Sequence, residues 1–165
     1  MIGGLSSFLK ILILGSSAFV LSFSNQYIKD TKINQFEYPI LIIAATLGMF
    51  VMVSSNNLIG LYLGIELQSL SLYVLAALNR DSVKSTEAGV KYFVLGALSS
   101  GLLLYGCSLI YGFTGSTNYY IIATNFDSHN IALLFGLVFI LVGLAFKISA
   151  IFWPHLKAIT LVTVT

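Results

Sequence analysis

The sequence predicts an all-α membrane protein of about five transmembrane helices, and three observations predict this class. Hydrophobic residues make up 58% of the 165 residues and charged residues only 8%, whereas a soluble domain carries about a quarter charged residues. Five apolar runs are each long enough to cross a bilayer as a helix. The clear turn signals fall between these runs. We therefore expect residues 1–165 to form a single transmembrane helical domain.

The first helix is predicted at about residues 5–23. This run could be a secretory signal, but no basic residue precedes it and Lys10 interrupts it. Its end, Ser22-Phe23-Ser24, is also a poor small-residue cleavage site. We interpret the run as a membrane helix whose Lys10 side chain reaches the nearer surface or faces a neighbouring helix.

The second and third helices are predicted at about residues 38–54 and 58–78. Only Ser55-Asn56-Asn57 separates them, and so short a link predicts an antiparallel hairpin. Gly60 and Gly64 form a G-x-x-x-G pair, which lets helices approach closely in lipid. This pair could form a dimerisation face, but packing within the chain is the interpretation we favour.

The fourth and fifth helices are predicted at about residues 88–111 and 131–152. The single cysteine, Cys107, lies inside the fourth run, so no disulfide can form within the chain. We interpret Cys107 as a small apolar packing residue.

Loop charges predict the orientation. The links after the first and third runs carry lysine or arginine, and Lys157 follows the fifth run. The opposite links, residues 55–57 and 112–130, carry neither. The positive-inside rule places the basic links, which we call the basic side, on the negative side of the membrane. The scattered basic residues form no patch that would bind nucleic acid.

Glu66 and Lys147 are charged residues inside apolar runs. A charge near the centre of a membrane helix costs roughly 2.5 to 3.5 kcal/mol, so such a group is expected to have a partner or a function. Glu66 lies near the predicted midplane, and Lys147 lies roughly 8 Å from the basic end of its run. An opposite charge within about 4–6 Å favours the charged form of both groups. Such a pair could switch proton affinity, or it could be a static ion pair that pins two helices.

Lys91 lies about three residues inside the fourth run, where its side chain could reach the surface or pass protons between helices. The two histidines, His129 and His155, are too far apart to form a metal site, and the chain holds no nucleotide-binding glycine loop. Composition and spacing therefore predict no cofactor in this chain.

Two segments resemble subunit 2 of respiratory NADH:quinone oxidoreductase (complex I). Residues 62–77, YLGIELQSLSLYVLAA, resemble its Glu-bearing helix, and residues 85–112, STEAGVKYFVLGALSSGLLLYGCSLIYG, resemble the next part of that family. The match covers about residues 36–150 and looks most like the mitochondrial form of plants and protists. The resemblance implies an antiporter-like helical bundle and a role in proton translocation. It also implies that FMN, iron-sulfur clusters and quinone are held by other subunits.

In that family the residue matching Glu66 pairs with the lysine matching Lys147, in a helix interrupted near that lysine. The lysine matching Lys91 belongs to the same central row of polar groups. The chain departs from the family after Lys147, where it reads AIFWPHLK at residues 150–157. The displaced His155 therefore has no assigned role.

The resemblance also implies that this chain lacks the rest of the family fold, including two helices before it and several after it. A split gene with a separate partner chain, or a truncated or incomplete sequence, would each account for this. The expected function is that of a membrane-arm subunit of proton-pumping NADH:ubiquinone oxidoreductase, bound to other membrane subunits and to lipid. The expected location is the mitochondrial inner membrane, with a bacterial plasma membrane as the alternative. Two other functions stay open: a subunit of a multi-subunit cation/proton antiporter, and an electrically silent assembly scaffold.

Overall fold

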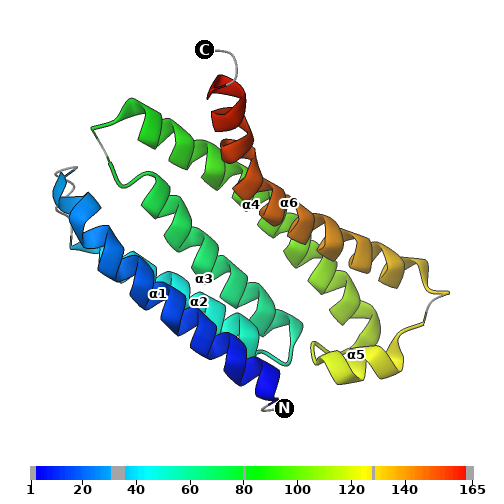
Figure 1. Cartoon of the computed structure of the whole chain (residues 1–165). Coiled ribbons are helices and arrows are strands. Elements are labelled where there is room, and N and C mark those ends of the chain that lie inside the picture. The colour runs from blue at the N-terminus through cyan, green and yellow to red at the C-terminus, as the bar shows by residue number, and fades with distance from the viewer. Residues whose placement is uncertain (1–2, 31–35, 80, 128, 163–165) are drawn as a thin grey trace. The chain divides into compact units, whose positions relative to one another are not determined.

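The computed structural model describes residues 3–30, 36–79, 81–127 and 129–162, with side chains described in 3–24, 36–79, 81–127 and 129–148. These ranges form six helices, shown in Figure 1. The helices are α1 (Gly4–Asp30), α2 (Glu37–Ser54), α3 (Leu58–Ala76), α4 (Val83–Thr114), α5 (Tyr119–Asn125) and α6 (Ile131–Val162).

The all-helical, multi-pass membrane fold is confirmed. Five of the described helices are long and apolar enough to cross a membrane: Gly4–Ser24, Glu37–Ser54, Leu58–Ala76, Val83–Thr114 and Ile131–Ile148. The helices α1 and α4 extend beyond the predicted apolar runs, because polar residues continue the backbone hydrogen bonding outside the membrane. The seven-residue helix α5 lies in the link that was expected to be irregular. It is too short to show a helical period.

The implied interruption near Lys147 is not present. The backbone of α6 is helical without a break from Ile131 to Val162, although its red C-terminal part turns away from the rest of the helix in Figure 1. Pro154 follows Lys147 by seven residues. A proline removes one hydrogen bond of the helix and bends it, which need not end it.

The chain forms two compact units, residues 1–91 and 92–165, and α4 runs through both. The first unit is built on the hairpin of α2 and α3, which lie side by side in Figure 1. Its short turn is held by Asn57, whose side-chain Oδ1 accepts a hydrogen bond from the Gly60 N–H at 2.6 Å. This bond satisfies one of the backbone donors left free at the start of α3. The predicted antiparallel hairpin is confirmed.

Glycines bring the backbones of α2 and α3 into contact. A Cβ atom on Gly48 would lie 2.6 Å from the backbone N of Gln68, and one on Gly64 would lie 2.7 Å from the backbone N of Met52. Gly64 therefore packs within the chain, as favoured above. Gly60 lies instead against the turn, where an added Cβ would meet Asn57 Oδ1 at 2.8 Å.

The second unit packs α4 against α6 in the same manner. A Cβ on Gly106 would lie 2.7 Å from the carbonyl O of Gly136, and one on Gly143 would lie 2.9 Å from the backbone N of Leu103. This order of contacts makes the two helices antiparallel. At the end of α4, Gly115 adopts a φ of 72°, and its N–H donates to the Tyr111 carbonyl at 2.8 Å. Glycine adopts this left-handed conformation without the strain that a Cβ would add.

Candidate functional site

Glu66 lies on the face of α3 that points away from α2. The residues on either side of it, Gly64 and Gln68, make the backbone contacts with α2. Each is two positions from Glu66, which is about 160° around the helix at 100° per residue. The carboxylate is half-buried on this opposite face.

Polar side chains accompany Glu66 along this face of α3. Tyr62, Ser69 and Tyr73 lie four, three and seven positions from it, spacings that place side chains on one side of a helix. We call Tyr62, Glu66, Ser69 and Tyr73 the polar stripe. Tyr73 and Ser69 are buried, with 6% and 8% of their surfaces exposed. Their side chains are hydrogen-bonded to each other, and Glu66 interacts electrostatically with the Tyr73 hydroxyl.

The serine hydroxyls also bond to their own helices. Ser69 donates to the Ile65 carbonyl at 2.8 Å, and Ser71 donates to the Leu67 carbonyl at 2.8 Å. In α4, Ser99 donates to the Gly96 carbonyl at 2.8 Å. These bonds satisfy hydroxyl donors inside apolar helices without a partner from another helix.

Lys147 lies on the face of α6 that packs against α4. It follows Ile140 and Gly143 by seven and four positions, and both of these residues meet the α4 backbone glycine or its neighbours. Because α4 and α6 are antiparallel, the register places Lys147 beside the turn of α4 that holds Gly96 and Ser99. The lysine is half-buried there. Its proposed partner Glu66 belongs to the other unit, and their pairing stays a prediction.

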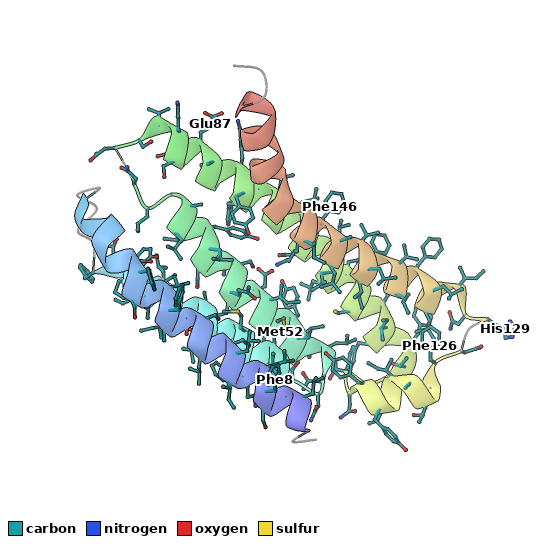
Figure 2. All side chains as sticks on the ribbon, viewed as in Figure 1. Phe8, Met52, Glu87, Phe126, His129 and Phe146 are labelled. Atoms are coloured by element: carbon teal, nitrogen blue, oxygen red, sulfur yellow. The ribbon has the colours of Figure 1, made fainter. Side chains whose placement is uncertain are left out.

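Lys91 forms a salt bridge with Glu87, one turn earlier in α4. Both side chains are exposed in this chain, at 68% and 58%. The pair lies on the opposite face of α4 from Gly89, where an added Cβ would meet Ala77 of the α3 end at 2.5 Å. Figure 2 labels Glu87 in the first turns of α4.

Glu87 is a candidate residue that the sequence interpretation missed. Its position four residues before Lys91 is the spacing at which a glutamate and a lysine meet on a helix. This spacing would have identified the pair, had the helix been expected to begin at Val83 and not at about residue 88.

The described residues contain no group of three or more His, Cys, Asp or Glu side chains that could hold a metal ion. His129 lies in the exposed link before α6, where its N–H donates to the Asp127 carboxylate at 2.9 Å. The side chain of His155 lies outside the described residues. The expectation that this chain binds no cofactor stays a prediction.

Residues 55–155 match the family model described as NADH:quinone oxidoreductase/Mrp antiporter, TM. The matched segment includes Glu66, Lys91 and Lys147. The chain is 62% identical over 150 residues to NADH-quinone oxidoreductase subunit N of Pelagibacter ubique, covering 91% of this chain and 32% of that protein. It is 60% identical over 152 residues to subunit N of Parvibaculum lavamentivorans, with 91% and 32% covered. The chain thus spans about a third of the length of these relatives.

Two solved structures share the fold. One is respiratory complex I from Thermus thermophilus with bound aureothin, with a TM-score of 0.58 and 35% identity over 67% of this chain and 24% of that chain. The other is the membrane-bound sulfane sulfur reductase, an archaeal respiratory membrane complex, with a TM-score of 0.69 and 30% identity over 83% and 28%. The two curated relatives named above are bacterial, so the comparisons do not support the mitochondrial type expected from the motifs.

Proposed function

This chain belongs to the NADH:quinone oxidoreductase/Mrp antiporter transmembrane family, and we propose that it forms part of the membrane arm of a proton-translocating NADH:quinone oxidoreductase. The observation that carries this proposal is the position of Glu66. The carboxylate lies inside an apolar helix, on the face opposite its packing partner α2 and within a stripe of polar side chains. The identity to bacterial subunit N supports the same assignment.

In this proposal Glu66 controls the proton affinity of Lys147. A nearby carboxylate favours the charged form of a lysine, and its withdrawal or protonation favours the neutral form. Lys147 lies beside close-packed helices with little polar surface, where such a change in charge has a large effect. Lys91 and Glu87 would pass protons laterally at the basic side. A static ion pair would hold the helices without moving protons.

We propose further that the redox groups, namely FMN, iron-sulfur clusters and quinone, are held by other subunits. The partners would be other membrane subunits and the bilayer, and a separate chain could supply the remaining helices of the family fold. The bacterial relatives favour a bacterial plasma membrane as the location. The mitochondrial inner membrane is the alternative that the motif resemblance favours.

A second candidate function is a subunit of a multi-subunit cation/proton antiporter. The family name includes Mrp antiporters, and the fold is shared with a respiratory complex that is a sulfane sulfur reductase. Sodium-dependent proton movement in vesicles without NADH would indicate this function.

The test uses membrane vesicles from cells whose native chain carries Glu66→Gln or Lys147→Ala. Proton uptake is followed with a pH-sensitive dye and divided by the NADH oxidised. Both variants are expected to lower this ratio while the complex stays assembled on a native gel. Glu37→Gln, the same chemical change at the first turn of α2, serves as the control and should leave the ratio unchanged.

Normal pumping in both variants would refute the proposed role of the pair. If deletion of the chain also removed the whole complex, the protein would instead be an assembly scaffold.

A further inference from the structure

The polar stripe continues beyond Glu66 towards the basic side. Between Glu66 and the end of α3 at Ala76, the same face carries Ser69, Leu70 and Tyr73. Ser69 and Tyr73 are therefore the polar side chains of this face in the part of α3 nearer the basic side. Tyr73 lies about 10 Å further along the helix than Glu66.

The geometry of α3 directs the Tyr73 hydroxyl back towards Glu66. Long side chains in a helix lean towards its N-terminus and cover the preceding turn. The Tyr73 ring therefore extends over the turn that holds Ser69, which agrees with the hydrogen bond between the two side chains. The electrostatic interaction between Glu66 and Tyr73 places the carboxylate within range of the same hydroxyl.

The hydrogen-bond pattern fixes the direction of the Ser69–Tyr73 bond. A serine hydroxyl has one hydrogen, and the Ser69 hydrogen is directed to the Ile65 and Glu66 carbonyls, at 2.8 and 3.1 Å. Tyr73 is then the donor to Ser69 Oγ. A buried tyrosine hydroxyl usually has such a partner, and this one holds the hydroxyl at a defined place on the Glu66 face.

We propose that Tyr73, held by Ser69, is a positioning residue for Glu66. Its hydroxyl is the polar group that the Glu66 carboxylate meets on the basic-side half of α3. It keeps the carboxylate on the face away from α2, in the orientation in which it exchanges a proton. This inference rests on the proposed function, because it assigns Tyr73 a role only if Glu66 takes part in proton translocation.

The test compares Tyr73→Phe with Tyr105→Phe in the assembled complex. Both substitutions remove one hydroxyl and keep the ring. Tyr105 lies on α4 with 52% of its surface exposed and packs edge-on against Phe139 at 5.1 Å. Two quantities are measured: protons taken up per NADH oxidised, and the infrared band of the protonated Glu66 carboxyl. The band is assigned as the one that Glu66→Gln removes.

Tyr73→Phe is expected to shift the carboxyl band and to lower the proton ratio about threefold or more, within the range of coupling between groups of one network. Uncoupled NADH oxidation should stay at the parent rate. Tyr105→Phe should change none of these quantities. If Tyr73→Phe lowers the amount of complex, Ser69→Ala replaces it, since this change releases the hydroxyl without altering the ring. It should produce the same band shift.

A Tyr73→Phe or Ser69→Ala complex with an unshifted band and a parental proton ratio would overturn this inference. The proposed function would still stand if Glu66→Gln lowered the ratio in the same preparation. Normal pumping by Glu66→Gln would instead refute the function itself.

Discussion

The backbone contact between α2 and α3 predicts that these helices cannot accept a methyl group at Gly48. The Cβ of an alanine there would lie 2.6 Å from the Gln68 backbone N and 2.7 Å from the Gly64 carbonyl O. Ordinary contact begins at 3.4 Å, so the closest approach is about 0.8 Å too short. Both neighbouring atoms belong to the backbone and cannot rotate away as a side chain would. The two helices must separate, as they do in other overpacked interiors.

The magnitude follows from a matched pair of substitutions. Replacing glycine with alanine inside a helix gains up to about 1 kcal/mol of helix propensity, and this gain would mask part of the packing cost. Gly101 lies within α4 and has no atom within 4 Å of an added Cβ. The difference between Gly48→Ala and Gly101→Ala cancels the propensity and leaves the overpacking cost, about 1–3 kcal/mol.

The assay is thermal unfolding of the detergent-solubilised protein. For a protein of this size a change of 1 kcal/mol shifts the melting temperature by about 2–4 °C. Gly48→Ala should therefore melt about 2–12 °C below Gly101→Ala. Gly64→Ala should show the same sign, because its added Cβ would lie 2.7 Å from the Met52 backbone N. Equal melting temperatures for Gly48→Ala and Gly101→Ala would refute the close backbone contact.

Two further predictions concern local interactions. Asn57→Ala removes the side chain that accepts the Gly60 N–H and should lower the free energy of unfolding by about 1 kcal/mol. The exposed neighbour variant Asn56→Ala should melt like the parent, and equal melting of the two variants would contradict the cap. Glu87→Ala removes the partner of Lys91, but both side chains are exposed, so stability should fall by no more than about 0.5 kcal/mol. Lower proton uptake at parental melting temperature would support a relay role for this pair, whereas a large loss of stability would show that it is structural.

The sequence by itself determined the fold class and the number of membrane helices. Backbone groups have no water to bond in lipid, so an apolar run of sufficient length must form a helix. It also determined the hairpin, because three residues between two helices permit only a reversal of direction. The cost of a charge in lipid was enough to single out Glu66. The short helix α5 and the pairing of Glu87 with Lys91 were missed, because each depends on helix ends that apolar length does not define.

Only the tertiary structure decided which way each helix faces. The helices α2 and α3 are apolar nearly all the way around, and hydrophobicity gives no preferred side to such a helix when its surroundings are also apolar. The close approach of Gly48 and Gly64 selects one face of α3 for contact with α2. Glu66 is thereby placed on the opposite face with Ser69 and Tyr73, since its position around the helix is fixed relative to Gly64.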